Sequence, residues 1–166
     1  MHLLPVYSGS LDQDLREAFA TAQVSAGTPL PEKGCVFISV NDRDKPAAVE
    51  AASSFAQFGF QLAATRGTAA VLKAAGLACK TILKVNEGRP NSVDLMKAGA
   101  IQLVIYTPTG AYSFNDEKVI RRTAVFHRIP CITTLSGARA AAEALASRRR
   151  GGLRVWSLQE IHTPVG

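Results

Sequence analysis

From Gly34 onward the chain repeats one pattern, in which a short apolar run is followed by a polar loop and then by a stretch with helical spacing of apolar residues. The apolar runs are residues 35–40, 60–64, 81–85, 101–106 and 131–134. This alternation is typical of βαβ units, in which each helix returns the chain to the start of a parallel sheet. It predicts an α/β fold with three layers and a doubly wound, mostly parallel sheet of about five strands. The run 101–106 is the most apolar, so we expect it at the centre of the sheet.

The stretches between these runs carry residues that favour helix ends. Pro46 suits the first turn of a helix, whereas Gly59 and Gly76 suit the ends of the first two helices. The later helical stretches end at Lys97 or span residues 115–128 and 136–146. After them, apolar and polar residues alternate over 153–158, which predicts an edge strand or a packed tail.

One domain accounts for most of the chain, which has 166 residues and is 47% hydrophobic. Residues 1–33 lack the repeating pattern and are interpreted as a linker or the tail of a preceding domain, with residues 1–10 as a candidate addition to the native chain. Residues 34–166 form the predicted domain. No apolar run approaches the roughly 20 residues that span a membrane, and the N-terminus lacks a signal-peptide pattern. We therefore expect a cytoplasmic protein without a membrane partner.

The three cysteines and the overall charge narrow the classes of ligand. Cys35, Cys79 and Cys131 lack metal-ligand spacing and lie beside apolar residues, so we expect reduced, buried packing residues and no metal site. The net charge of +6 favours anionic partners, including nucleic acid and small phosphorylated ligands. The arginines 148–150 follow an Ala-rich helix and are interpreted as a solvated helix end. Interleaved aromatic residues or a basic helix are missing, so no nucleic-acid partner is expected.

A phosphate site is predicted at the carboxyl ends of the strands, where open parallel sheets bind ligands. The turn 65–68 offers the hydroxyls of Thr65 and Thr68, a glycine that allows close backbone approach, and the free N–H groups of the next helix. Lys45 and Lys84 approach from neighbouring strands. The plain alternative is that Thr65 or Thr68 only caps that helix.

Catalytic machinery is not evident in the sequence. The histidines are scattered, no cysteine has a credible histidine partner, and phosphate-loop, zinc and serine-elbow motifs are missing. Four aspartates remain as candidate acid–base groups, namely Asp42, Asp44, Asp94 and Asp116. Asp42 and Asp44 have the spacing of residues that start a helix, which is the commoner use. The sequence therefore favours sensing of an anion over catalysis, and no catalytic residue is predicted.

The order of these motifs resembles one family, the methylglyoxal-synthase-like domain that closes the large subunit of carbamoyl-phosphate synthetase. The similarity covers roughly residues 34–162 without large gaps and extends to residues 16–23, which resemble the end of the preceding synthetase domain. It rests on the motifs Ser39-Val40, Asp44-Lys45, Gly59-Phe60, Ala64-Thr65-Arg66-Gly67-Thr68, Lys84-Val85, Glu87-Gly88-Arg89-Pro90, Val119-Ile120-Arg121-Arg122 and Thr133-Thr134-Leu135.

The resemblance implies an allosteric domain that is not an enzyme on its own and that binds a nucleoside monophosphate, UMP or IMP, with ornithine as a further effector. It implies no cofactor in this domain and a parent enzyme that uses ATP with Mg or Mn in pyrimidine and arginine biosynthesis. The partners that it implies are the rest of the large subunit and a glutaminase small subunit. The phosphate positions that it implies are Lys45, Thr65, Gly67, Thr68 and Lys84. Base and ribose positions are Ser39, Thr107 and Asp116, and Thr133 is linked to ornithine.

This sequence departs from the family pattern at three positions. Tyr106 stands in place of an Asn, Pro108 in place of a Thr and Cys131 in place of a Tyr, which affects the expected base preference and ornithine response. A methylglyoxal synthase of the same fold is the alternative. That enzyme uses an aspartate beside a Gly-Gly pair, whereas this chain has residues 86–93 in its place.

Overall fold

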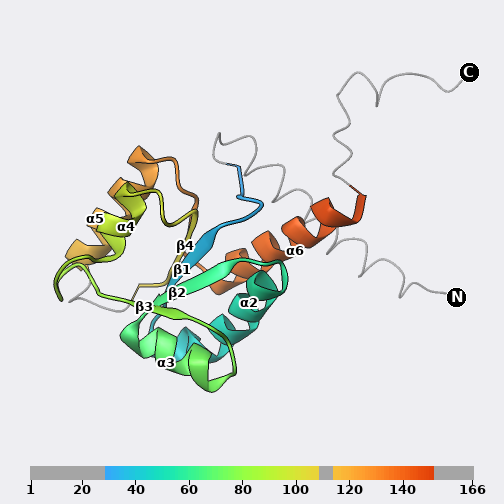
Figure 1. The fold of residues 1–166 in the computed structure, drawn as a ribbon, viewed down its shortest axis with the longest axis horizontal. Helices are drawn as coiled ribbons and strands as arrows, with labels where there is room; N and C mark the ends of the chain where they lie inside the picture. The colour runs from blue at the N-terminus through green and yellow to red at the C-terminus, as the bar shows by residue number, and fades with distance from the viewer. Residues whose placement is uncertain (1–28, 109–113, 152–166) are drawn as a thin grey trace, which may run out of the picture.

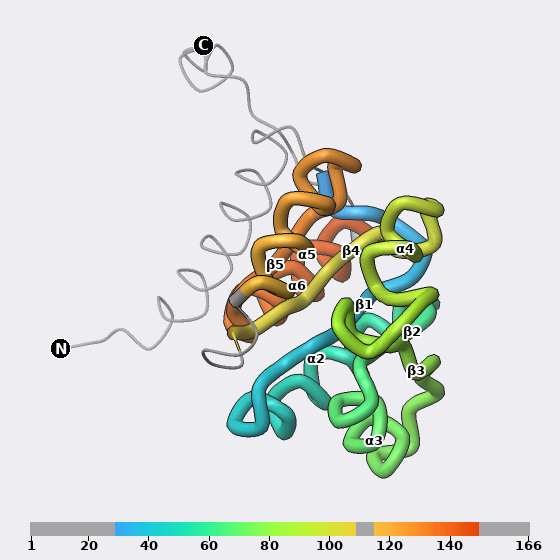
Figure 2. Tube along the Cα trace, turned by 90° about the vertical axis from the view of Figure 1, so that its left-hand side faces the viewer, coloured from blue at the N-terminus to red at the C-terminus, as the bar shows by residue number. Residues whose placement is uncertain are grey.

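The computed structural model describes residues 29–108 and 114–151 (Figure 1). Its strands are β1 (Cys35–Ser39), β2 (Gln61–Thr65), β3 (Lys80–Ile82), β4 (Leu103–Tyr106) and β5 (Cys131–Ile132). In the described part of the chain they form one five-stranded sheet in the order β3-β2-β1-β4-β5, with every neighbouring pair parallel. Figure 2 shows this order running from β5, beside α5 and α6, to β3, beside α3. The predicted parallel α/β fold is confirmed.

Helices cover both faces of the sheet and complete the three layers (Figure 1). One face is covered by α2 (Lys45–Gln57), α3 (Arg66–Ala74) and α6 (Leu135–Gly151). The other face is covered by α4 (Ser92–Lys97) and α5 (Phe114–Phe126). A short 3-10 helix, η1 (Asp42–Asp44), links β1 to α2.

The central strand is β1, and its side chains enter both cores. Val36 and Ile38 pack in the core beneath α2, α3 and α6, whereas Phe37 packs in the core beneath α4 and α5. This division follows from the alternation of side chains along a strand. The sequence pattern predicted that residues 101–106 form a central strand, and β4 lies inside the sheet, between β1 and β5. Both strands are buried on two faces, so their composition alone does not separate them.

The helix ends agree with most of the sequence signals. Pro46 lies in the first turn of α2, and Gly59 and Gly76 follow α2 and α3 with positive φ angles of 88° and 84°. Helix α6 runs on to Gly151, so the arginines 148–150 lie inside its last turns and do not follow it. Of the predicted linker or tail, residues 1–33, residues 1–28 lie outside the described residues, as does the run 153–158.

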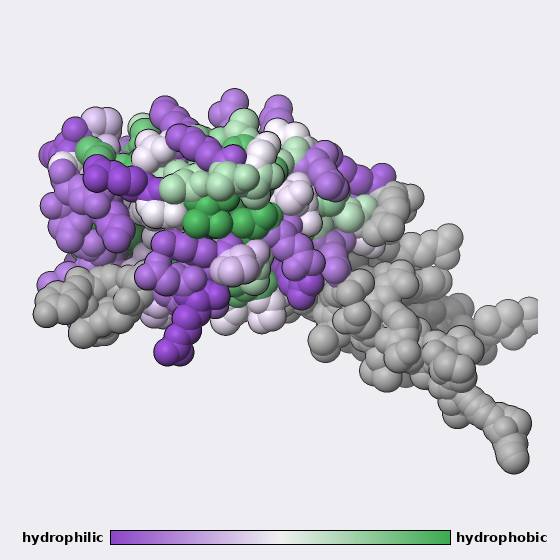
Figure 3. Space-filling view, turned by 90° about the horizontal axis from the view of Figure 1, so that it is seen from below, coloured by the Kyte–Doolittle hydropathy of each residue, from purple (hydrophilic) through white to green (hydrophobic). Residues whose placement is uncertain are grey.

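The cysteines were expected to be buried, but all three are only partly buried, and each is a free thiol. Burial raises the pKa of the Cys35, Cys79 and Cys131 thiols above its ordinary value. Hydrophilic residues surround a small apolar area on the face in Figure 3. None of the helices in the described ranges is long and apolar enough to cross a membrane.

Candidate functional site

The strand order creates a crevice at the carboxyl edge of the sheet. After β3 the chain crosses to the other side of β1 and continues with β4, so the connections that follow β1 and β4 leave in opposite directions. Such a switch point is where open α/β sheets bind ligands. Because β1, β2 and β3 are parallel, the loops that follow them meet at the same edge of the sheet, as the sequence predicted.

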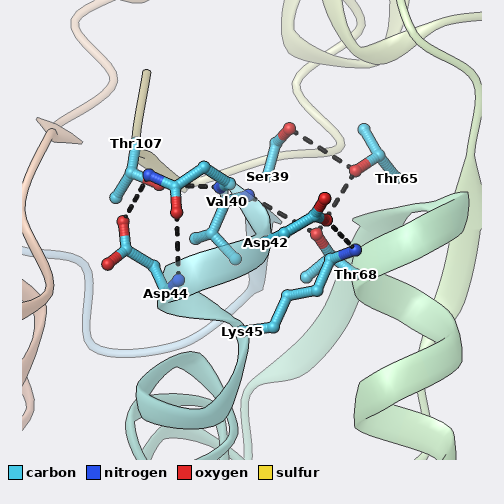
Figure 4. Close-up of polar contacts among 9 residues, drawn as sticks. Ser39, Val40, Asp42, Asp44, Lys45, Thr65, Thr68 and Thr107 are labelled. Carbon is cyan, nitrogen blue, oxygen red and sulfur yellow. Dashed lines mark hydrogen bonds and ion pairs between the residues drawn. The ribbon is translucent and has the colours of Figure 1, made fainter. Parts of the chain in front are cut away.

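Three buried hydroxyls meet in this crevice (Figure 4). The Ser39 Oγ atom, at the end of β1, lies 3.4 Å from Thr65 Oγ1, at the end of β2. Thr65 Oγ1 in turn lies 3.5 Å from Thr68 Oγ1, in the first turn of α3. Thr68 Oγ1 also accepts a long hydrogen bond of 3.4 Å from the Val40 backbone N–H. A hydroxyl both donates and accepts, so this group can turn its hydrogens toward an oxyanion.

The start of α3 lacks a threonine cap, which the sequence analysis gave as the alternative to a phosphate site. Thr65 occupies the N-cap position with an extended backbone, but its side chain makes no capping hydrogen bond. The first-turn N–H groups of α3 are therefore not occupied by the Thr65 hydroxyl. In that turn, a Cβ added at Gly67 would lie 3.1 Å from Lys45 Nζ. Glycine at this position leaves the Lys45 ammonium free to lie close to the α3 backbone.

Two lysines bring positive charge to the same place. Lys45 Nζ lies 2.5 Å from Asp42 Oδ1, and the Asp42 side chain is 92% exposed. The hydrogen bond from Lys45, its charge and the charge of Lys84 together hold the pKa of Asp42 below its ordinary value. Asp42 therefore neutralises part of the positive charge that an anion in this crevice would meet.

Asn41, which the sequence reasoning did not select, organises the loop after β1. Its side-chain oxygen accepts a 3.0 Å hydrogen bond from the Asp44 N–H, and its Nδ2 donates to Asp44 Oδ2 at 2.7 Å. Its backbone N–H donates to Thr107 Oγ1 at 3.0 Å, which ties this loop to the end of β4. Asn41 therefore caps η1, whereas Asp44 makes no side-chain cap to α2 and Asp42 is paired with Lys45. The prediction that Asp42 and Asp44 start the helix was correct in position only.

The crevice contains two adjoining cavities, the phosphate-side cavity of about 190 Å³ and the sheet-side cavity of about 250 Å³. Their shared lining consists of Ser39, Thr65 and Lys84. The phosphate-side cavity is lined by Ser39, Val40, Asn41, Asp42, Lys45, Thr65, Gly67, Thr68 and Lys84. All five residues predicted to contact a phosphate thus lie around one hollow.

The sheet-side cavity has apolar walls and a few polar groups. Its apolar lining includes Phe37, Tyr106 and Ile120, and its polar lining includes Asn86, Ser92 and Asp116. Of the predicted base and ribose positions, Ser39 and Asp116 line this cavity. Thr107 lines neither of the two cavities, and its hydroxyl accepts a hydrogen bond from Asn41 instead. Asn86 and Ser92 were missed because a single polar residue in a loop or at a helix start carries no sequence signal of its own.

Other predicted positions lie apart from these cavities. Thr133 follows β5, is half-buried and lines neither cavity. The hydroxyl of the next residue, Thr134, accepts a 3.0 Å hydrogen bond from the Gly137 N–H at the start of α6. Arg89 pairs with Asp94 at 2.7 Å, and Asp94 also belongs to the capping box of α4. The hydrogen bond from Arg89 and the Asn91 N–H lower the pKa of Asp94, which assigns this aspartate a structural role.

Arg66 is exposed at the start of α3 and lines neither cavity. Among the described residues, no group of three or more His, Cys, Asp or Glu side chains has an arrangement that could hold a metal ion.

Comparison with known proteins identifies the family. The model of the MGS-like domain matches residues 47–133. The carbamoyl phosphate synthase large chain of Acidobacterium capsulatum is 54% identical over 146 residues, which are 88% of this chain and 13% of that protein. The large chain of Pseudomonas aeruginosa is 44% identical over 149 residues, 90% of this chain and 14% of that protein. The C-terminal section of the large chain of Aquifex aeolicus is 46% identical over 157 residues, 92% of this chain and 29% of that protein.

The chain thus spans a small fraction of the curated relatives that it matches. It lines up with them over about nine-tenths of its own length, and the match includes a protein named as a C-terminal section. The resemblance drawn from the motifs is confirmed. This chain belongs to the MGS-like domain family and is similar to the corresponding part of carbamoyl phosphate synthase large chains.

Proposed function

We propose that this chain is the allosteric regulatory domain of a carbamoyl phosphate synthase large chain and that it binds a nucleoside monophosphate such as UMP or IMP. The observation that carries the proposal is the gathering of Ser39, Thr65 and Thr68 hydroxyls with two lysines beside the uncapped start of α3. These groups are the partners that a phosphate monoester needs.

In this proposal, the phosphate lies in the phosphate-side cavity. The hydroxyls of Thr65 and Thr68 and the first N–H groups of α3 donate to its oxygens, while Lys45 and Lys84 neutralise its charge. Gly67 leaves room for the oxygens to approach the backbone. Each charge-assisted hydrogen bond contributes on the order of 1.5 to 3 kcal/mol.

The rest of the nucleotide extends into the sheet-side cavity. The two cavities share Ser39, Thr65 and Lys84, so a ligand anchored in one can extend into the other. The aromatic and aliphatic walls suit the faces of a base, and Asp116 suits a ribose hydroxyl. Tyr106, which is 3% exposed and lines this cavity, stands where the family pattern has Asn, so base preference is expected to differ from the family pattern.

The further parts of the proposal concern the whole enzyme. We propose that ornithine acts near Thr133, away from the nucleotide, and that the partners are the rest of the large chain and a glutaminase small chain. The parent enzyme uses ATP and Mg or Mn in the cytoplasm, within pyrimidine and arginine biosynthesis. In this proposal the domain itself carries no catalytic residue and no cofactor, which is consistent with the pairing of Asp42 to Lys45 and of Asp94 to Arg89.

The proposal is tested by calorimetric titration of the chain with UMP, IMP, ornithine and acetylglutamate at low salt, where electrostatic attraction is strongest. Lys84→Ala should weaken binding of the preferred nucleotide by about tenfold or more, because one charge-assisted partner is lost. Lys80→Ala is the matched control, since Lys80 is an exposed lysine at the first residue of β3, whereas Lys84 follows the other end of that strand. Equal affinity of Lys84→Ala and the parent would refute the phosphate site at Lys84. If the parent binds neither nucleotide, the proposal that the ligand is UMP or IMP is refuted.

A further inference from the structure

One polar side chain in the sheet-side cavity makes no hydrogen bond to the described residues. The Ser92 side chain is 1% exposed, and its Oγ has no hydrogen-bond partner among the described residues. A buried hydroxyl without a partner is costly, so one in a native structure is explained by strain, a catalytic role or a bound partner. Ser92 also lines the sheet-side cavity, so a ligand in that cavity could supply the missing partner.

Ser92 is not needed to start α4. The cap is supplied by Asn91, whose side-chain oxygen accepts from the Val93 and Asp94 N–H groups at 3.0 and 3.2 Å. Ser92 contributes only its backbone N–H, which donates to the Leu83 carbonyl at 3.3 Å. An alanine at this position would keep that backbone bond and would lose only the hydroxyl.

The surroundings of Ser92 indicate what its partner would be. Phe37, Ile120 and the ring of Tyr106 give the cavity apolar walls, and all three residues are nearly fully buried, so the walls favour a flat ring over a hydrated sugar. A ring that fills such a cavity still needs one hydrogen-bonding contact at its edge. The hydroxyl of a serine donates and accepts, so it can serve a ring carbonyl or a ring nitrogen.

We propose that Ser92 is the specificity-determining residue for the heterocycle of the bound nucleotide, and that its hydroxyl makes the hydrogen bond to the edge of the base. This inference rests on the proposed nucleotide site. In the proposed complex the single phosphate lies in the phosphate-side cavity, whereas Ser92 lines only the sheet-side cavity. Contacts in the phosphate-side cavity are therefore available to any phosphate monoester, whereas the contact with Ser92 requires a base.

The experiment compares the parent chain with Ser92→Ala by calorimetric titration of UMP, IMP and ribose 5-phosphate, which carries no base. For the preferred nucleotide, Ser92→Ala should raise Kd by about tenfold, since a base atom is left without its buried partner. For ribose 5-phosphate, the same substitution should leave Kd unchanged. The control Ser54→Ala removes a hydroxyl that bonds to the Glu50 carbonyl on α2 and should change neither Kd.

A thermal melt of the ligand-free variants separates a binding role from a structural one. Ser92→Ala should melt at the same temperature as the parent or above it, because an unpartnered buried hydroxyl is removed. A lower melting temperature with unchanged nucleotide affinity would overturn the inference, as would equal losses for the nucleotide and ribose 5-phosphate. Unchanged nucleotide affinity would overturn the inference by itself, and it is the result expected if the hydroxyl only binds a water molecule. If neither nucleotide binds the parent chain, the proposed function itself fails.

Discussion

The arginine run at the end of α6 offers a test of how the last helix is held. The Arg149 guanidinium donates to the Phe58 carbonyl at 2.7 Å and to the Glu32 carbonyl at 3.2 Å, and it lies 5.1 Å from the centroid of the Phe58 ring. Arg149 therefore joins α6 to the end of α2 and to the segment before β1. Arg149 is exposed, as expected for a solvated helix end, but it also makes these contacts, which the sequence interpretation did not include.

The expected effect of Arg149→Ala follows from these contacts. Hydrogen bonds from a charged donor contribute about 1.5 to 3 kcal/mol when buried, but these are exposed to solvent and are worth less. A cation–π contact at an exposed site adds about 0.5 to 1 kcal/mol. We expect a loss of about 1 to 2 kcal/mol in the free energy of unfolding, which lowers the melting temperature by about 2 to 8 °C in a domain of this size.

Differential scanning calorimetry of Arg149→Ala measures this loss, with Arg148→Ala as the control from the same run. Arg149→Lys keeps the charge but loses the planar guanidinium that lies over the Phe58 ring and reaches both carbonyls through Nη2, so it should restore little stability. Nucleotide affinity should not change, because Phe58 and Glu32 lie near the amino edge of the sheet, opposite the candidate site. If the two alanine variants melt at the same temperature, the contacts of Arg149 contribute nothing and the run is a solvated helix end after all.

Two further predictions concern the site. Asp42→Asn should raise nucleotide affinity, because Lys45 is released from its ion pair, and the gain should shrink as salt is added. Because the pKa of Asp42 is lowered, the carboxylate should compete for Lys45 throughout the neutral range, and its stabilising pair should be lost only as the pH falls through that lowered pKa. A titration in which Asp42→Asn and the parent agree at low salt would contradict this. The chain alone should form neither carbamoyl phosphate nor methylglyoxal, and phosphate release from dihydroxyacetone phosphate above background would disprove the second half.

The sequence by itself determined the elements of this fold and the edge of the sheet where a ligand would bind. Period-two and period-3.6 patterns are local properties, so the strands and helices could be located from neighbouring residues alone. The phosphate positions Lys45, Thr65, Gly67, Thr68 and Lys84 could be grouped because parallel strands deliver all their following loops to one edge. Nothing more than strand direction was needed for that step.

The tertiary structure decided which of these residues touch and what else joins them. The central position of β1, the hydroxyl contacts from Ser39 to Thr68 and the placement of Ser92 in a cavity all depend on chain segments far apart in sequence. The same is true of Arg149, whose partners precede it by 91 and 117 residues. Side-chain contacts of this kind leave no periodic trace, because their spacing along the chain is set by how the helices pack on the sheet and by no local repeat.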